Sequence, residues 1–421
     1  MFPKLRFKKF NGDWEKTTIG AKSEIITSGS RDWAQYYSDS GDKFIRMTNL
    51  VRNGINLDLS DLRFVQLPVG SNEGKRTSLE KGDILISITA ELGKLGWIPE
   101  GLGTAYINQH TALVRMKNTL DSKFVAYALS TEKYNNKLNS LNDSGAKAGL
   151  NLGSIRSFEL TIPSKLEQTK IASFLSAVDE KISQLTQKHE LLSQYKQGMM
   201  QKLFSQQIRF KADDGSEFGE WEEVKFSGIF NFHQTNSYSR ALLAEYGEIM
   251  NIHYGDIHTK FSMLFDVNKE SVPFLNDEVD TSKIAKEQFL KVGDLVIADA
   301  SEDYKDIGKS IEVISLNNQK VVAGLHTYIA RPVKPFALGF CGYMMQTFPV
   351  REQIKKLATG ISVLGISKTN LGKVELKVPS LEEQTKIANF LSAIDQKIEV
   401  VVQQIEQAKQ WKKGLLQQMF V

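Results

Sequence analysis

The sequence lacks several features that define common protein classes. Cys341 is the only cysteine among 421 residues, which excludes an internal disulfide and a zinc site built from a cysteine cluster. No apolar run approaches the ~20 residues that a membrane-spanning helix requires, and the opening MFPKLRFKKF has no signal-peptide apolar core. Hydrophobic residues make up 41% of the chain and charged residues 24%, which is typical of globular proteins. We therefore expect a cytoplasmic protein with no membrane partner.

Known enzyme signatures are also missing. The segment GSNEGKRTS (70–78) is one residue too short between its glycines for a phosphate-binding loop, and Arg76 replaces the required Ser or Thr. No two prolines are adjacent, which excludes the Asn-Pro-Pro-aromatic signature of amino-methylating DNA methyltransferases. The six histidines form no metal-binding spacing, and a nuclease-like grouping around Glu223 and Lys225 is of a kind that arises by chance. We expect no catalytic residue, metal site or cofactor in this chain.

The net charge of +4 is small and unevenly distributed. Residues 1–160 carry 22 basic and 17 acidic side chains, whereas residues 211–378 carry 19 basic and 23 acidic ones. A protein that binds nucleic acid mainly through its phosphates needs a broad excess of Lys and Arg. Any contact with nucleic acid is therefore expected to be local or shared with a partner.

What the sequence does contain is an internal repeat. The segment QTKIASFLSAVDEKI at 168–182 returns as QTKIANFLSAIDQKI at 384–398, with 12 of 15 positions identical. Weaker echoes have the same offset of 216 residues, including the Pro-Ser pairs and the His-Thr pairs that precede each copy. A long-period repeat of this kind indicates two copies of one structural unit. The chain therefore reads as domain, connector, domain, connector.

Both connectors are predicted to be long helices that form a coiled coil. Their apolar residues recur at alternating steps of four and three, and each keeps a lysine, Lys196 or Lys412, at the same seam position. His189 fills another seam position and is interpreted as a register-setting polar residue. Antiparallel pairing is expected because the second domain must return the chain to the start of the second helix. The predicted seam residues are Ile171, Leu175, Val178, Ile182, Leu185 and Leu192 in the first helix, and Ile387, Leu391, Ile394, Ile398, Val401 and Ile405 in the second.

Ser164 and Ser380 precede these helices, each with a glutamate three residues later, which predicts a capping box. About 40 residues at ~1.5 Å each give a helix of roughly 60 Å. The alternative is an amphipathic helix that packs only on its own domain. The duplication favours pairing between the two helices instead.

The domains themselves have short apolar runs separated by Gly, Asn, Asp and Ser, which predicts an α+β fold with short strands and many loops. Helices are expected at 121–140 and 338–357. The predicted boundaries are 1–162 for the first domain, 163–206 for the central helix, 207–378 for the second domain and 379–421 for the C-terminal helix.

The sequence resembles the specificity subunit of type I restriction–modification systems. The resemblance is carried by the paired PS-x-x-EQTKIA-x-FLSA-(V/I)-D-x-KI segments at 163–182 and 379–398, and by the opening PKLRFKKFNGDWE with its echo before the second domain. It implies two target-recognition domains that each read half of a split, asymmetric double-stranded DNA site, and a helical spacer. It also implies two methyltransferase subunits and two restriction (motor-nuclease) subunits as partners. S-adenosylmethionine, ATP and Mg would then be bound by those partners.

Polar loops are the candidates for base contacts, because readout in the major groove uses Arg, Lys, Asn, Gln, Ser and Thr. The candidates in the first domain are Ser28, Ser30, Arg31, Arg46, Thr48, Asn49, Lys75, Arg76 and Lys147. Those in the second domain are Thr235, Asn236, Ser237, Tyr238, Ser239, Arg240, Asn251, His253, Tyr254, Ser362 and Lys368. His110 and His326 are expected to tie strands or loops together.

Two other classes of function compete with this interpretation. A DNA enzyme that acts alone is disfavoured by the missing methylase, nuclease and nucleotide motifs. A coiled-coil adaptor that joins proteins without reading bases is compatible with the helices, although the repeated domains and their loop clusters speak against it.

Overall fold

The computed structural model describes residues 3–141 and 149–420, and the chain forms two compact units. Unit 1 comprises Met1–Thr186 and Gln403–Val421, and unit 2 comprises Gln187–Val402. Each unit therefore holds one of the two domains together with a segment of each long helix. Among the described residues, no helix combines the length and apolarity that crossing a membrane would require.

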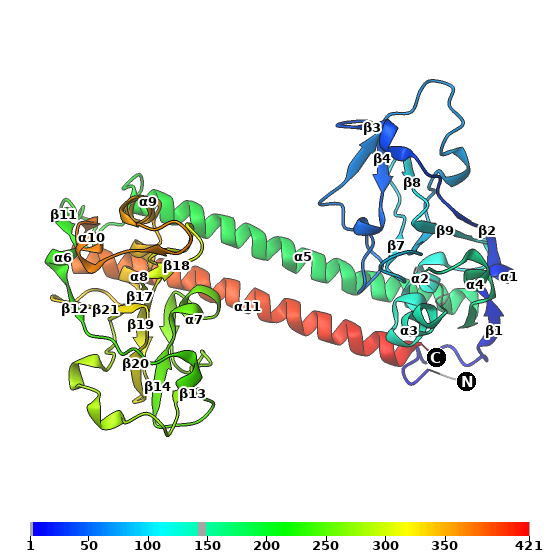
Figure 1. The fold of residues 1–421 in the computed structure, drawn as a ribbon. Helices are drawn as coiled ribbons and strands as arrows, with labels where there is room; N and C mark the ends of the chain where they lie inside the picture. Colours follow the sequence, from blue (N-terminus) through cyan, green and yellow to red (C-terminus); the bar gives the residue numbers. More distant parts are fainter. Residues whose placement is uncertain (1–2, 142–148, 421) are drawn as a thin grey trace. The chain divides into compact units, whose positions relative to one another are not determined.

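The domain of unit 1 contains two four-stranded sheets and a two-stranded one (Figure 1). The first sheet has the order β2-β9-β6-β7, the second β3-β5-β4-β8, and the small one pairs β1 with β10. The strands are β1 (Glu15–Thr18), β2 (Ser23–Ser28), β3 (Tyr37–Ser38), β4 (Asp42–Ile45), β5 (Arg63–Val65), β6 (Ile84–Ser87), β7 (Leu95–Trp97), β8 (Ala105–Ile107), β9 (Thr111–Met116) and β10 (Glu159–Ile162). The helices are α1 (Ile19–Lys22), α2 (Ser122–Ser130), α3 (Glu132–Ser140) and α4 (Leu152–Ser157).

Unit 2 repeats this strand order. Its first sheet runs β12-β21-β17-β19 with β15 added at the edge, its second runs β13-β16-β14-β20, and β11 pairs with β23. The strands are β11 (Glu222–Lys225), β12 (Phe230–His233), β13 (Leu243–Ala244), β14 (Ile249–Ile252), β15 (Leu264–Asp266), β16 (Phe274–Leu275), β17 (Leu295–Ala298), β18 (Ala300–Ser301), β19 (Ser310–Ser315), β20 (Lys320–Ala323), β21 (Thr327–Pro332), β22 (Leu364–Gly365) and β23 (Glu375–Val378). The helices are α6 (Phe226–Ile229), α7 (Tyr254–Thr259), α8 (Phe340–Met345), α9 (Phe348–Leu357) and α10 (Lys368–Leu371). The α+β fold and the internal repeat are confirmed.

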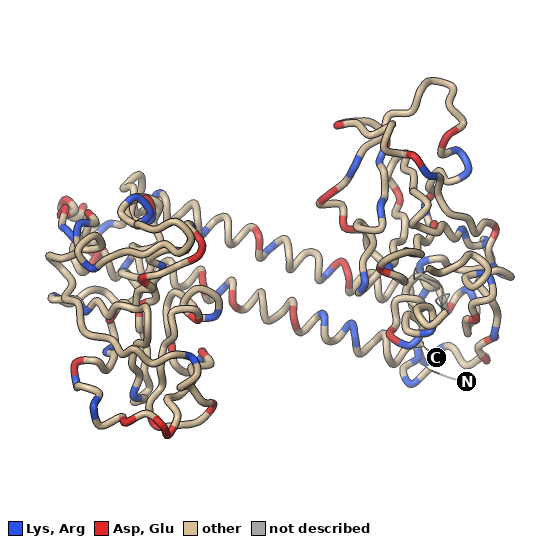
Figure 2. Tube along the Cα trace, in the orientation of Figure 1, with Lys and Arg blue, Asp and Glu red and all other residues tan. Residues whose placement is uncertain are grey.

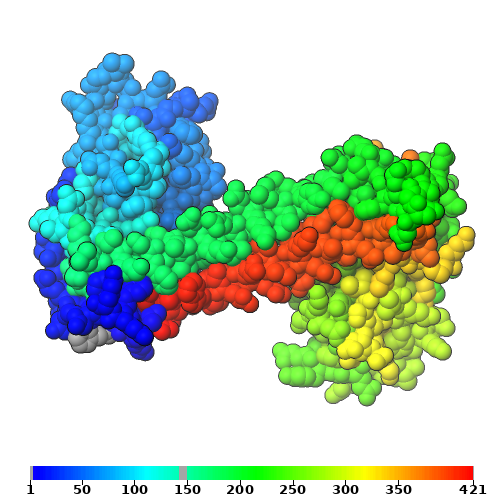
Figure 3. Space-filling model, turned by 180° about the vertical axis from the view of Figure 1, so that it is seen from behind, coloured from blue at the N-terminus to red at the C-terminus, as the bar shows by residue number. Residues whose placement is uncertain are grey.

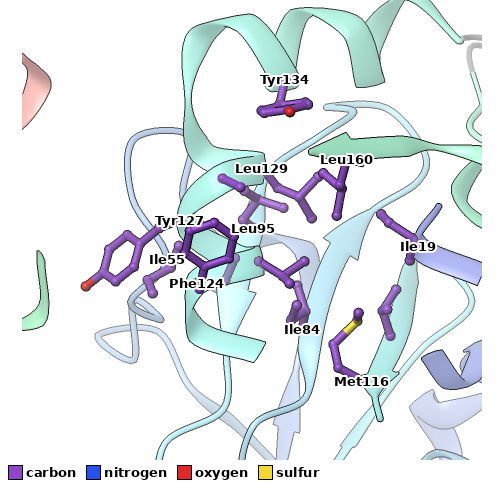
Figure 4. Close-up of a cluster of buried hydrophobic side chains, with 14 of the residues drawn as sticks. Ile19, Ile55, Ile84, Leu95, Met116, Phe124, Tyr127, Leu129, Tyr134 and Leu160 are labelled. Atoms are coloured by element: carbon purple, nitrogen blue, oxygen red, sulfur yellow. The ribbon is translucent and has the colours of Figure 1, made fainter. Parts of the chain in front are cut away.

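Buried apolar strands explain why these sheets form. All four residues of β6, and all four of β17, are buried, as expected for continuous apolar runs that are covered on both faces. Figure 4 shows how α2 contributes Phe124, Tyr127 and Leu129 to the core of unit 1. The predicted helical stretch at 121–140 is two helices, α2 and α3, because Thr131 caps a new helix between them. The stretch at 338–357 is likewise divided into α8 and α9.

The two long helices are α5 (Lys165–Phe204) and α11 (Leu381–Met419). In unit 1 the beginning of α5 packs with the end of α11, and in unit 2 the end of α5 packs with the beginning of α11, so the helices run antiparallel as predicted. In Figure 3, the two helix segments of each unit lie side by side. The seam residues Ile171, Leu175, Val178, Leu185, Ile387, Leu391, Ile394, Val401 and Ile405 are buried, whereas Ile182, Leu192 and Ile398 are half-buried. His189 is also half-buried.

The first turns of each seam also belong to the core of their own domain. Ile171, Leu175 and Val178 share one buried cluster with residues of the first domain, and Ile387 and Leu391 do so in the second. Packing on the domain and pairing between helices are therefore both present. Pairing of the long helices and packing of each helix on its own domain therefore do not exclude each other.

At the start of α11, the serine caps the helix as predicted, but the glutamate does not complete the capping box. Ser380 Oγ accepts a hydrogen bond from Glu383 N at 3.3 Å, but the Glu383 carboxylate turns away from the cap. It accepts bonds from Arg209 Nε at 3.0 Å and NH2 at 2.7 Å, and from Trp221 Nε1 at 3.1 Å. This buried carboxylate therefore holds the start of the second domain on the helix instead of completing the cap.

Unit 1 uses the same device. Arg6 Nε and NH2 each donate to the Glu167 carboxylate at 2.7 Å, and Arg6 NH2 also donates to Gly12 O at 2.6 Å. In unit 2, Arg209 NH2 donates to Gly219 O at 2.6 Å. The echo between LRF at 5–7 and IRF at 208–210 is the sequence signal for this repeated ion pair.

The seam lysines form a second repeated set of polar contacts. Lys412 Nζ is 2.5 Å from Asp179 Oδ1. The second oxygen of this carboxylate, Oδ2, accepts a hydrogen bond from the Tyr127 hydroxyl at 2.7 Å. In unit 2, Lys196 and Tyr343 contact the carboxylate of Asp395 at 2.5 and 2.7 Å. Each set therefore joins a domain tyrosine, the aspartate of one repeat and the lysine of the other repeat. Such a polar contact in an apolar seam favours one register.

Candidate nucleic-acid interface

The clearest shared site in the two domains lies where β4 and β14 end. Each of these strands pairs in parallel with a neighbour, β8 or β20, and runs directly into a short helix. The N-terminal cap of that helix is Arg46 in the first domain and His253 in the second. The third residue after the cap is Asn49 or Asp256, and each is 1% exposed. A strand that runs into a short helix thus presents different side chains in the two domains; the helix is a 3₁₀ helix (Met47–Asn49) in the first and α7 in the second.

In the first domain, Arg46 is held by its surroundings. Its NH2 group donates to Asp61 O at 2.8 Å and to Asp61 Oδ2 at 2.7 Å. Asn49 Oδ1 accepts from Arg46 N at 2.9 Å, and Asn49 Nδ2 donates to Asp58 O at 2.8 Å. Because Asn49 is buried and occupied in this way, we correct its assignment from base contact to support of the loop.

In the second domain, the surroundings of His253 favour its neutral form. Its Nδ1 accepts a hydrogen bond from Gly255 N at 3.1 Å and lies 3.2 Å from Arg240 NH2. Burial and the charge of Arg240 hold the pKa of His253 below its usual value. The ring is therefore neutral near pH 7, and its single proton is on Nε2 because Nδ1 is an acceptor.

Asp256 is the charged centre of this second site. Its Oδ1 lies 3.1 Å from Arg240 NH2 and 3.1 Å from Lys260 Nζ, and both cations are more than half exposed. The ring of Tyr254 lies 4.7 Å from that of His253 and 5.4 Å from that of His326, measured between centroids. The structure therefore brings Arg240 to His253 and Tyr254, although it is 13 residues from His253 in the sequence.

Asn251 does not face outwards. It is fully buried in β14, and its Oδ1 accepts a hydrogen bond from Asn236 Nδ2 at 2.9 Å. Thr235 Oγ1 donates to Thr327 O at 3.0 Å. We therefore correct Asn251 from base contact to support of the loop that carries Asn236, because its side chain cannot reach a groove without unfolding the strand.

The remaining candidates of the first domain lie around the end of β2 and on nearby loops. Arg76 donates to Thr27 Oγ1 and, at 3.1 Å, to Ser28 O, so it fixes the strand end. Arg31, Thr48, Lys75 and Arg76 are exposed, and Ser28 and Ser30 are half-buried. Lys147 lies outside the described residues. For the exposed side chains, DNA contact stays a prediction.

The remaining candidates of the second domain have mixed surroundings. Tyr238 packs on a small apolar cluster, and Lys368 lies over the rings of Tyr328 and Phe232 at 5.2 and 5.9 Å. Ser237, Ser239, Ser362 and Lys368 are exposed. Their contact with DNA also stays a prediction.

Two histidines that were expected to tie loops together do so. His110 Nδ1 lies 2.8 Å from Thr89 Oγ1, and His326 Nδ1 lies 3.2 Å from Asp299 Oδ1. His258, which carried no strong signal in the sequence, lies in the same neighbourhood as Tyr254, with ring centroids 6.1 Å apart. Across the described part of the chain, no three His, Cys, Asp or Glu side chains are placed to hold a metal ion.

Charge is mixed on both domains. Figure 2 shows positions of Lys and Arg interspersed with positions of Asp and Glu along the loops of each unit. A surface of this kind gains little from phosphates alone. Discrimination between bases by individual side chains is the chemistry that this arrangement suits.

A family model described as "Type I restriction modification DNA specificity domain" matches residues 11–194 and, a second time, residues 219–410. The chain belongs to this family. It is a DNA-recognition subunit with two target-recognition domains and no catalytic role of its own. The resemblance stated from the sequence is confirmed.

Relatives of this specificity subunit cover most of its length. A Methanocaldococcus jannaschii protein described as the MjaX specificity subunit of a type I restriction enzyme is 24% identical, over 99% of this chain and 94% of that protein. The MjaVIII specificity subunit of the same organism is 27% identical over 61% of this chain and 60% of its own.

Solved structures show the same fold. The crystal structure of a type I restriction-modification S subunit from M. genitalium aligns with a TM-score of 0.60 at 15% identity, covering 100% of this chain and 99% of that one. A chain from a study of complex assembly and conformational transition of the type I system aligns with a TM-score of 0.53 at 13% identity, covering 96% and 97%.

Proposed function

We propose that each recognition domain reads one half of a bipartite, asymmetric double-stranded DNA site. The observation that carries this proposal is the shared strand order combined with different side chains at the equivalent strand ends. In each domain, the candidate residues lie where a strand with a parallel neighbour runs into a short helix, which supports one shared mode of reading. Arg46 in one domain and Arg240 with His253 in the other present different donors, which suits two different half-sites.

The long helices are the proposed spacer between the half-sites. A helix of 40 residues is roughly 60 Å long. One turn of B-DNA is roughly 34–36 Å, so this length is compatible with half-sites about one to two turns apart. Repeated polar contacts at equivalent seam positions support a fixed register, and therefore a fixed number of unread base pairs.

The near-identity of the segments 168–182 and 384–398 supports a docking task that is performed twice. We propose two methyltransferase subunits as the partners that dock there, joined by two restriction subunits. Those partners are proposed to bind S-adenosylmethionine, ATP and Mg in a cytoplasmic complex. The acidic balance of residues 211–378 further suggests that the methyltransferase subunits supply most of the phosphate contacts.

The test is a genome-wide map of adenine methylation. Cells that express this chain with its methyltransferase subunit are compared with cells that express the methyltransferase alone. A split motif that appears only with this chain, and whose first half changes when residues 1–162 are exchanged, is the expected result. A stable complex that yields no motif would favour the competing function, a coiled-coil adaptor without base readout.

A further inference from the structure

The second domain contains a charged cluster that reaches from a buried carboxylate to the surface. Asp256 is 1% exposed, and the Arg240 side chain that it contacts is 53% exposed. A buried carboxylate is costly unless it is paired, so Asp256 holds a cation close to itself. Because the second partner, Lys260, is the C-terminal cap of α7, the same short helix that carries Asp256, the contact to Arg240 is the one that crosses between loops.

We propose that Arg240 reads a guanine in the half-site of the second domain, and that Asp256 is the positioning residue that aims it. This inference rests on the proposed function, because it assumes that residues 207–378 read one half-site. It adds the chemical identity of one base and the residue that selects it.

The donors and acceptors of the cluster favour guanine. Arg240 Nε and NH1 have no partner among the described residues, and His253 Nε2 carries a proton, so the exposed atoms of these two side chains are donors. The acceptor Asp256 Oδ1 is buried and already bound by two cations. In the major groove, guanine presents two acceptors, N7 and O6, whereas adenine and cytosine each present an amino donor. Thymine presents one acceptor and a methyl group.

The first domain lacks this arrangement at the equivalent position. Its counterpart of Asp256 is Asn49, which is neutral and bonded to the backbone. Its basic residue, Arg46, is instead held by Asp61, which is 71% exposed. An arginine held by a buried charge loses less freedom on binding, and a domain with an acidic balance has more need of such a base contact.

The experiment maps adenine methylation by the full chain assembled with its methyltransferase, for the parent and for Arg240→Gln, Arg240→Lys and Asp256→Asn. Lys260→Gln is the matched control, because it removes the other cation from Asp256. We expect Arg240→Gln to relax a single guanine of the second half-site and to lower methylation of the parent sites by about 10- to 100-fold. Asp256→Asn should relax the same position to a smaller extent, and Lys260→Gln should leave the motif unchanged.

Two results would overturn the inference. One is an unchanged motif with uniformly weaker methylation in Arg240→Gln, which would make Arg240 a phosphate contact. The other is a parent motif whose second half contains no guanine. Arg240→Lys and Asp256→Asn keep the test valid if Arg240→Gln does not fold, since loss of stability alone does not change base identity. A separate control exchanges residues 207–378 in the parent complex. If this exchange changes neither half-site, the proposed function itself is refuted, and this result is known before the point variants are compared.

Discussion

Removal of the lysine from the buried contact in unit 1 should destabilise that unit strongly. Lys412 and Asp179 are 13% and 12% exposed, and their charged atoms are 2.5 Å apart. In Lys412→Met, the apolar stem is kept, but among the described residues the Asp179 carboxylate retains the Tyr127 hydroxyl as its one partner. Breaking a fully buried pair costs about 3–5 kcal/mol. Because some solvent reaches both groups, we expect about 2–3 kcal/mol.

The matched control is Lys196→Met in unit 2, where the corresponding side chains are 21% and 33% exposed. Better solvation should limit its cost to about 1 kcal/mol. A second control, Asp179→Asn combined with Lys412→Met, removes the unpaired charge and should recover more than half of the loss. Both comparisons use side chains of similar volume, so that packing changes little.

The assay is thermal unfolding, recorded by calorimetry and by tryptophan fluorescence. Four of the five tryptophans are in unit 1, so fluorescence mainly follows the unit that Lys412→Met affects. For a unit of about 200 residues, a loss of 2–3 kcal/mol lowers the Tm by about 5–10 °C. Equal losses in the two lysine variants, or a double variant no more stable than Lys412→Met, would refute the reasoning from burial.

Three further predictions follow from other buried groups. Glu383→Ala should lower the free energy of unfolding by about 1 kcal/mol more than Glu167→Ala, because it also removes the acceptor of Trp221 Nε1. Equal losses of unfolding free energy, measured with urea, would contradict this. Burial raises the pKa of Glu312 to about 7, so between about pH 4.5 and 7 the folded chain keeps a proton that the unfolded chain releases. Stability should therefore fall as pH rises through this window, by up to about 3 kcal/mol, and level off above it; Glu312→Gln should remove this dependence from the Tm. Burial also raises the pKa of the Cys341 thiol, so a thiol reagent should label it only on unfolding, and rapid labelling of the native chain would contradict its placement.

The helices could be predicted from the sequence because their signal is periodic and is written twice. The spacing of Ile171, Leu175 and Val178 defines a face without knowledge of anything distant. The role of Glu167 could not be predicted in the same way. Its local pattern predicts a cap, but its partner Arg6 is 161 residues away, and a buried ion pair overrides a solvent-exposed cap.

The candidate site could be predicted only in part, because its residues come from separate loops that the fold brings together. Arg240 and His253 were recognised as polar loop residues, but their contact through Asp256 depends on strand order, which no local pattern records. Asn49 and Asn251 were misassigned because an asparagine in or just after a short strand looks accessible in a sequence. Asn251 lies within β14, and Asn49 is the last residue of the short helix that follows β4. Whether such a side chain points inwards depends on the pairing register.

The division of the helices between the units has a consequence for synthesis. Residues 403–421 complete unit 1, where Leu415 and Met419 are buried with Leu175, and Leu5 N donates to Gln418 O at 2.9 Å. These residues follow the whole of unit 2 in the sequence, so the domain of unit 1 is completed only after the domain of unit 2 has been translated. Until then its apolar helix face stays uncovered, and contacts across more than 200 residues form slowly. Removal of residues 403–421 should therefore damage the domain of unit 1 more than the domain of unit 2, although unit 2 is nearer in the sequence.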